Sequence, residues 1–147
     1  MLRAEALLLA VSLGAVLWLA VACAPGRRVS IVANGYSLRA TVYGKPTPRD
    51  PRPGLLFLTG WSPSRFAWRP SNAHAGIGAK RLGCVCMTVA LRGMGSPGDV
   101  ARLTRADFLE DAAAAYDFLA ALDGVDRERV SVVGESFGSY LACVLSA

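Results

Sequence analysis

Apolar residues are distributed in two different ways along this chain. Residues 6–25 are uncharged and almost continuously apolar, with no polar face. From residue 29 onward, short apolar runs alternate with glycine, proline and charged residues. An uncharged run of about 17–25 residues approaches the length of a membrane span, whereas short runs bounded by turn residues are typical of strands. We therefore divide the chain into residues 1–28 and residues 29–147.

The first part has the features of a targeting segment. Arg3 precedes a leucine-rich stretch, and small residues around position 22 fit a signal cleavage site. Residues 20–23 also approach a bacterial lipoprotein signal, which ends in the cysteine to be acylated. Arg27 and Arg28 directly after the apolar run would favour a retained anchor with that side in the cytoplasm. We predict a membrane-associated or exported protein, with anchor, lipoprotein signal and cleaved signal left open. A buried core helix is less favoured, because no polar face interrupts the run.

The second part begins with a predicted hairpin. Residues 29–33 and 37–43 alternate between apolar and polar side chains, and Asn34-Gly35 lies between them. This dipeptide accepts the positive φ angles of a tight turn, so it favours two antiparallel strands. Residues 45–54 contain four prolines and are expected to form an exposed connector.

Strands and helices then alternate. Apolar runs at residues 54–60, 84–90 and 130–133 predict buried strands, and residues 73–82 and 104–122 predict helices. Thr104 and Asp107 have the spacing of a capping box, Gly124 suits the helix stop, and residues 126–129 predict a polar turn. This order predicts one α/β domain with a mostly parallel sheet and an N-terminal antiparallel hairpin.

Charge and cysteine content remove several function classes. The formal charge of +5 comes mostly from arginines scattered through loops, so a nucleic-acid partner is not expected. The chain has four cysteines but no pair of CxxC units, which gives no support for a zinc site. We predict no metal and no cofactor. Cys84, Cys86 and Cys143 are interpreted as core thiols.

The last predicted strand runs into the sequence Gly134-Glu135-Ser136-Phe137-Gly138. This is the G-x-S-x-G pattern of a nucleophile elbow, between a buried strand and an apolar helix as that motif requires. Small residues two before and two after the serine avoid collisions at a sharp turn. The helix N-terminus that follows stabilises an anion formed there. The alternative is a glycine-rich turn whose serine only caps the helix.

Together with two further loops, the elbow gives the chain a family resemblance. Residues 58–61 (Leu-Thr-Gly-Trp) resemble an oxyanion loop, and residues 91–96 (Leu-Arg-Gly-Met-Gly-Ser) resemble an Arg-Gly-x-Gly-x-Ser loop. With the hairpin and the elbow in the same order, residues 29–147 resemble the α/β-hydrolase superfamily. The esterase, dienelactone hydrolase and serine aminopeptidase branches are the most similar.

The resemblance implies roles for individual residues. Ser136 would be the nucleophile, attacking a small-molecule ester or amide to form an acyl-enzyme. The backbone N–H groups of Phe137 and Trp61 would form the oxyanion hole, with Ser62 replacing Trp61 if the loop is shifted by one residue. The chain also departs from the family pattern. Thr59 and Met94 stand where histidine is common, and Ser139 replaces a frequent glycine.

The partners of the nucleophile are not evident in the sequence. In this family the acid and the histidine follow the serine, but the eleven residues after Ser136 have neither a charge nor an imidazole. His74 is the only histidine, and we expect it at the surface. We interpret Asp107, Asp111 and Asp117 as solvated helix charges, and assign Glu135 no role in a triad. We therefore expect the N-terminal half of a serine hydrolase, truncated after the elbow helix and with little or no turnover by itself.

Two other functions stay open. One is a catalytically dead, membrane-associated protein that keeps the fold for binding a partner. The other is an acyltransferase or haloperoxidase variant of the same fold. Trp61, Phe66 and Trp68 could line an apolar substrate pocket or pack a loop, and the sequence does not decide between these.

Overall fold

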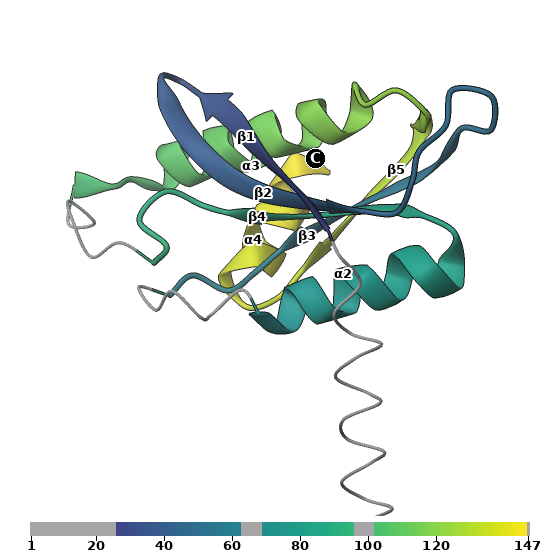
Figure 1. Cartoon of the computed structure of the whole chain (residues 1–147). Coiled ribbons are helices and arrows are strands. Elements are labelled where there is room, and N and C mark those ends of the chain that lie inside the picture. The colour runs from purple at the N-terminus through teal and green to yellow at the C-terminus, as the bar shows by residue number, and fades with distance from the viewer. Residues whose placement is uncertain (1–25, 63–68, 96–101, 147) are drawn as a thin grey trace, which may run out of the picture.

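The computed structural model describes residues 26–62, 69–95 and 102–146 (Figure 1). In chain order the elements are β1 (Arg27–Ala33), β2 (Tyr36–Tyr43), β3 (Arg52–Leu58), α2 (Arg69–Leu82), β4 (Val85–Ala90), α3 (Arg105–Ala120), β5 (Val125–Gly134) and α4 (Phe137–Leu145). The strands form one five-stranded sheet in the order β1-β2-β4-β3-β5. β1 and β5 form the two edges of the described sheet.

The predicted hairpin is confirmed. β1 and β2 pair antiparallel, and Ala33 faces Tyr36 across the turn. Asn34 and Gly35 have φ angles of 45° and 78°. These left-handed angles are those of a tight hairpin turn of type I′, which asparagine and glycine adopt more easily than other residues.

The predicted parallel sheet is also confirmed. β3 lies between β4 and β5 and pairs parallel with both, whereas β2 joins the sheet antiparallel to β4. Because β3, β4 and β5 run in one direction, their carboxyl ends lie at the same end of the sheet. The loops after these three strands therefore meet there.

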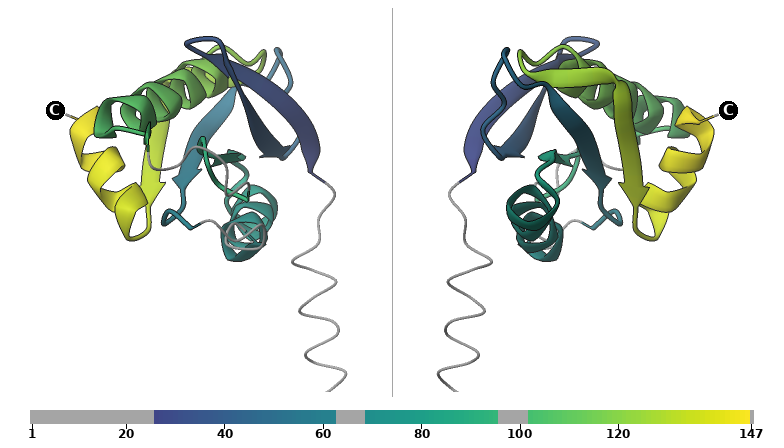
Figure 2. Two further views of the ribbon diagram at one scale, coloured as in Figure 1. Left: turned by 90° about the vertical axis from the view of Figure 1, so that its left-hand side faces the viewer. Right: turned by 90° about the vertical axis from the view of Figure 1, so that its right-hand side faces the viewer.

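Helices cover both faces of the sheet. Figure 2 shows α2 on one face and α3 with α4 on the other. β4 is buried on both sides, and its side chains alternate between two apolar clusters. Val85 and Met87 belong to the larger cluster with α3 and α4, and Cys86 belongs to a smaller one with Tyr43 and Ala75 of α2.

Two elements differ from the predicted bounds by four residues or more, and the others differ by one or two. α2 begins at Arg69, four residues before the predicted start, with Pro70 in its first turn, where proline is tolerated. β5 begins at Val125 and runs through the predicted polar turn. Asp126 pairs with Pro53 and Val130 with the next residue, Gly54, so residues 127–129 have no partner in β3. The predicted turn is thus a bulge within the strand.

The cysteines are not all core thiols. Cys86 is buried as predicted, Cys84 is partly buried, but Cys143 is exposed on α4, so its prediction was wrong. Gly138 and Leu141 are buried on one face of α4. Its other face, with Tyr140 and Val144, is exposed, as is Val133 of β5.

The predicted targeting segment stays a prediction. Residues 1–25 lie outside the described residues, as do Phe66 and Trp68 of the suggested pocket. Within the described residues, no helix is long and apolar enough to span a membrane.

Candidate active site

Ser136 has a backbone conformation that residues other than glycine rarely adopt. Its φ and ψ angles are 53° and −120°, at the point where β5 ends and α4 begins. A residue with a Cβ in this region is strained by about 1–3 kcal/mol, which persists only where the surroundings enforce it. The Glu135 N–H donates to the Leu58 carbonyl at 3.0 Å and fixes the entry to the turn. We call residues 134–138 the elbow.

The Ser136 side chain does not cap the helix that follows it. Ser136 is the N-cap residue of α4, yet its hydroxyl makes no capping hydrogen bond and is exposed. A serine selected as a cap would accept a bond from the N–H two or three residues later. The capping interpretation is therefore wrong, and the strained turn presents a free hydroxyl instead.

The glycines of the elbow are required by close backbone approach. A Cβ on Gly134 would collide with the carbonyl of Gly138, one turn into the helix. A Cβ on Gly138 would collide with the carbonyl of Leu58 at the end of β3. The helix can therefore start against β3 only without side chains at these two positions. Ser139, which replaces a frequent glycine, donates from its hydroxyl to the Gly134 carbonyl at 2.9 Å and tightens the same turn.

The loop after β3 lies directly beside Ser136. A Cβ built on Gly60 would be 3.1 Å from the Cβ and 3.6 Å from the Oγ of Ser136. Trp61 and Ser62 follow Gly60 in the chain, so this loop starts beside Ser136. Trp61 packs against the larger apolar cluster, and its indole Nε1 is buried without a hydrogen-bond partner among the described residues. We call residues 59–62 the oxyanion loop, after the loop that they resemble.

Phe137 lies at the start of α4 and is held from α3. As the first helical residue, it has no acceptor one turn earlier for its backbone N–H. Its ring packs edge-on against Phe108 with the centroids 5.2 Å apart, and it stacks on Tyr140 at 5.9 Å. The side chain thus anchors the elbow to α3, while the N–H at the helix start is available to an anion.

A buried ion-pair network fixes the loop after β4, and the sequence did not reveal it. Arg92 is 7% exposed, and its Nη2 lies 2.6 Å from Oδ1 of Asp111, which is fully buried. The backbone N–H of Arg92 donates to the other oxygen of that carboxylate at 2.7 Å. Asp107 lies 2.7 Å from Nη1 of the guanidinium, and Glu110 lies 3.4 Å from Nη2. We call residues 91–95 the β4 loop.

The prediction that Asp111 is a solvated helix charge was therefore wrong. Asp111 lies three residues after Phe108 and four before Ala115, both buried on the apolar face of α3. This position within the apolar stripe was the signal available in the sequence. Asp107 closes the predicted capping box with Thr104 and also pairs with Arg92.

The network changes two pKa values. Hydrogen bonds from Thr104, with a smaller contribution from Arg92, hold the pKa of Asp107 below its ordinary value. The hydrogen bond to Asp111 raises the pKa of Arg92, although burial opposes this. Both shifts favour the charged forms, so the Arg92 guanidinium and the Asp107 carboxylate are ionised at neutral pH.

No acidic or basic side chain is hydrogen-bonded to Ser136 among the described residues. His74 is exposed on α2, as predicted, and Glu135 is exposed next to Ser136 in the chain. Asp107 and Asp111 are paired with Arg92, and Asp117 is exposed on α3. The structure thus brings together Ser136, Phe137, Gly60 and the start of the oxyanion loop.

Comparison with solved structures identifies the fold. The chain is similar to an esterase of Pyrobaculum calidifontis, with 23% identity, a TM-score of 0.67, and coverage of 89% of this chain and 43% of that one. It is 27% identical to a thermophilic and thermostable carboxylesterase cloned from a metagenomic library, with a TM-score of 0.67 and coverage of 84% and 40%. The chain has the α/β-hydrolase fold. An esterase of Thermogutta terrifontis is 25% identical, with a TM-score of 0.62 and coverage of 80% and 42%.

The similarity covers a limited part of these hydrolases. The chain spans about two fifths of the length of each of the three structures. No family model and no curated protein sequence matches it. The mixed sheet with helices on both faces, predicted from the alternation of strands and helices, is the part that the comparison supports.

Proposed function

We propose that this α/β-hydrolase chain carries the nucleophile and the oxyanion donors of a serine hydrolase that acts on small esters or amides. The observation that carries the proposal is the conformation of Ser136. Its left-handed backbone presents a free hydroxyl beside Gly60, between the end of β3 and the start of α4. A turn strained in this way, with an unused hydroxyl, is explained by chemistry better than by folding.

The proposed reaction is acyl transfer to the Ser136 hydroxyl. Oγ attacks the substrate carbonyl, a general base takes the hydroxyl proton, and the carbonyl oxygen becomes an oxyanion. We assign its stabilisation to the N–H groups of Phe137 and Trp61, with Ser62 as the alternative to Trp61. Each well-placed donor of this kind contributes about 10²–10³ in rate. Collapse of the intermediate expels the alcohol or amine and leaves an acyl-enzyme, which water hydrolyses.

The general base is the component that the chain does not evidently supply. His74 is the only histidine, and its side chain is exposed on α2. The hydroxyl of serine is a weak nucleophile at its ordinary pKa and needs an adjacent base. We therefore expect the 147-residue chain to turn over esters slowly or not at all, while Ser136 keeps its exposed position.

Esters are favoured over amides as the substrate class. The similar structures include esterases and a carboxylesterase, and one form of the Thermogutta terrifontis esterase is phosphorylated by paraoxon. An ester expels a better leaving group than an amide, so it places a smaller demand on a site with a weak base. Paraoxon is accordingly a suitable probe for the nucleophile of this chain.

The experiment is to treat the full chain with paraoxon in the presence and absence of imidazole, and to locate the adduct by peptide mass spectrometry. Imidazole replaces the missing base by taking the hydroxyl proton, while Oγ bonds to phosphorus and p-nitrophenolate leaves with the electron pair of its bond. We expect a diethylphosphoryl group on Ser136 that depends on imidazole and is lost in Ser136→Ala. Ser139→Ala is the matched control on the same helix and should be labelled like the wild type.

The outcomes separate the possible functions. Labelling of Ser136 without imidazole would show that a competent base is present and would contradict the expectation of slow turnover. No labelling under either condition would contradict the nucleophile and favour the catalytically dead binding protein. If labelling succeeds, ester substrates with added alcohol acceptors distinguish hydrolysis from acyl transfer by their products.

A further inference from the structure

The oxyanion loop is in direct contact with the β4 loop. The hydroxyl of Thr59 donates a hydrogen bond to Sδ of Met94 at 3.7 Å. Both residues are buried, with 1% and 3% of their surface exposed. Thr59 is the first residue after β3 and the last before Gly60, whose backbone lies beside Ser136. This contact therefore acts one residue away from the proposed site of chemistry.

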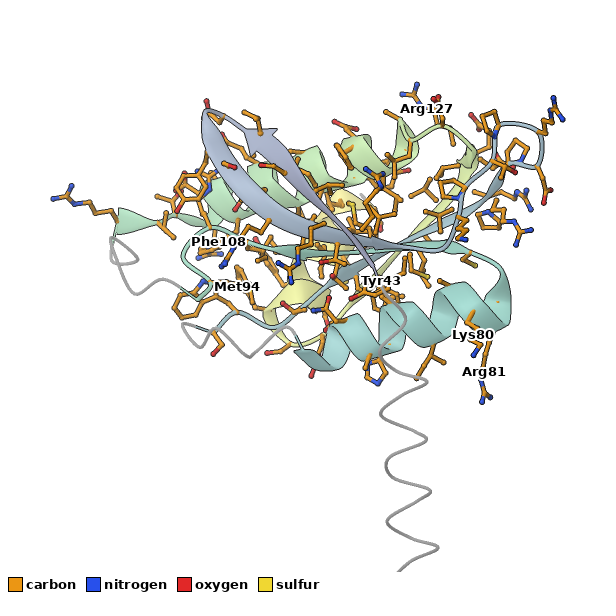
Figure 3. The ribbon with its side chains drawn as sticks, in the orientation of Figure 1. Tyr43, Lys80, Arg81, Met94, Phe108 and Arg127 are labelled. Carbon is orange, nitrogen blue, oxygen red and sulfur yellow. The ribbon has the colours of Figure 1, made fainter. Side chains whose placement is uncertain are left out.

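Met94 has a fixed position because the rest of the β4 loop is fixed. Its N–H donates to the Leu91 carbonyl at 3.0 Å, which closes a turn, and its own carbonyl accepts from Arg39 of β2 at 3.4 Å. Arg92, within the same turn, is anchored to Asp111 of α3. Figure 3 labels Met94 and Phe108, which belong to the same buried cluster. The backbone of Met94 is thus held from β2, and the loop that carries it is held from α3.

Thr59 is held from the opposite side by the elbow helix. A Cβ on Gly138 would lie 2.8 Å from the Thr59 carbonyl, so α4 rests directly on the backbone of this residue. The side chain of Thr59 faces Met94, while its backbone faces α4. The Thr59 hydroxyl is therefore a polar group through which the β4 loop fixes the orientation of the oxyanion loop.

We propose that Thr59 and Met94 are positioning residues that hold the Gly60–Trp61 segment in register with Ser136. The proposal rests on the proposed function, because it assigns these residues to the oxyanion hole of that site. Both stand where the family resemblance has histidine as a common residue, and here they contact each other. The two departures therefore form one structural feature, a hydroxyl–thioether contact between loops. A buried hydroxyl without this acceptor would lose its partner.

The test uses near-isosteric variants of the full chain. Thr59→Val keeps the shape and removes the donor, Thr59→Ser keeps the donor, and Met94→Leu removes the acceptor. One readout is the rate of Ser136 phosphorylation by paraoxon in imidazole. The other is the backbone amide chemical shifts of Gly60 and Trp61 by NMR, which need no reaction. Thermal unfolding of each variant measures global stability.

We expect Thr59→Val and Met94→Leu each to slow phosphorylation about tenfold or more, because a misplacement of about 1 Å can cost 10²-fold. Both should shift the amide resonances of Gly60 and Trp61. Thr59→Ser should keep a phosphorylation rate and amide shifts close to those of the wild type, because it keeps the donor. The double variant Thr59→Val/Met94→Leu should be no slower than either single variant, because the residues act through one contact.

Several results would overturn the proposal. These are unchanged Gly60 and Trp61 amide shifts in Met94→Leu, a Thr59→Ser variant as slow as Thr59→Val, or rate losses that follow only the melting temperature. The two proposals fail separately. If wild-type Ser136 is never phosphorylated, the proposed function fails, while the amide shifts and the rescue by serine still decide the positioning role.

Discussion

The elbow and the β4 loop lie at the same end of the sheet, but different forces fix them. The elbow is fixed by backbone contacts: Gly134 allows the end of β5 to approach the first turn of α4, and Gly138 allows that turn to approach the end of β3. The β4 loop is fixed by charge: Arg92 joins it to three carboxylates of α3. We therefore expect the elbow to be sensitive to added side-chain atoms, and the β4 loop to be sensitive to the loss of a charge.

This difference follows from what each region has to present. A nucleophile on a sharp turn must project from backbone that cannot relax, and short-range repulsion enforces this without any titrating group. A supporting loop can be held by longer side chains, because it reaches the oxyanion loop through the side chain of Met94. The elbow should therefore respond to steric changes, and the β4 loop to changes in charge and pH.

The largest expected effect is that of Gly138→Ala. The added Cβ would overlap the Leu58 carbonyl, which belongs to the main chain of β3 between β4 and β5 and cannot move aside. We expect a loss of about 3 kcal/mol or more, or failure to fold, since overpacking against backbone lies at the severe end of core substitutions. Urea denaturation followed by circular dichroism measures it.

Gly35→Ala is the matched control for this prediction. Gly35 has a φ of 78° in the hairpin turn, but a Cβ there would meet nothing within 4 Å. It therefore isolates backbone strain from collision, and we expect a cost of about 1 kcal/mol. Equal losses in the two variants would show that collision does not fix the elbow.

The next largest effect is that of Arg92→Met. The substitution leaves the fully buried Asp111 without its cation, and removing one partner of a buried ion pair costs about 3–5 kcal/mol. Arg39→Met is the control, because the Arg39 guanidinium is exposed and bonds only the Met94 carbonyl, at 3.4 Å, among the described residues. We expect about 1 kcal/mol or less for it in urea denaturation.

A double variant tests whether charge is the cause. Arg92→Met/Asp111→Asn removes both charges and keeps a side-chain oxygen to accept the backbone N–H of residue 92. It should be more stable than Arg92→Met alone. If the double variant is less stable than both single variants, the network is held by packing, and the contrast with the elbow disappears.

The sequence predicted the elbow more completely than the β4 loop, because the contacts that form the elbow are local in sequence and those of the β4 loop are not. The elbow is local: the end of a strand, two glycines around a serine and the start of a helix lie within a few residues. Its geometry therefore follows from the residue types of this short segment. The capping box of Thr104 and the turn at Asn34-Gly35 are local in the same way, and both were predicted. The conformation of Ser136 could thus be expected from the motif.

The network of Arg92 could not be read in this way, because its partners lie 15 to 19 residues away in another element. Asp111 by itself looks like any helix carboxylate, and only the path of the chain shows that it is buried. The bulge of β5 is a similar case: residues 127–129 read as a turn, and only the pairing with β3 shows the strand to continue. Tertiary contacts decided both.

Gly60→Ala tests the steric side of the comparison at the oxyanion loop. The Cβ would lie 3.1 Å from the Cβ of Ser136, so one of the two backbones must shift by a few tenths of an ångström. We expect slower phosphorylation of Ser136 by paraoxon in imidazole, by about tenfold, which corresponds to about 1.4 kcal/mol in the barrier.

Gly78→Ala provides the matched control for Gly60→Ala. Its Cβ would lie 3.2 Å from Sγ of Cys86, a similarly close approach between α2 and β4 on the other face of the sheet. We expect unchanged phosphorylation of Ser136. A similar slowing in both variants would mean that general loosening, and not the register of Gly60 with Ser136, limits the reaction.

The smallest expected effect concerns pH and the β4 loop. The pKa of Asp107 in the folded chain lies below its ordinary value of 3.8, first because of the Thr104 backbone N–H and then the Thr104 hydroxyl. A carboxyl with a lowered pKa stabilises the fold above its unfolded pKa, and this contribution is lost as the pH falls through the folded value. Stability should therefore decrease with acid below about pH 4, and Asp107→Asn should make this decrease shallower. Urea midpoints at several pH values measure the slope. The amide shifts of Gly134 and Gly138 at the elbow, where backbone contacts dominate, should stay constant over the same range. If they move together with those of the β4 loop, the two regions share one source of stability.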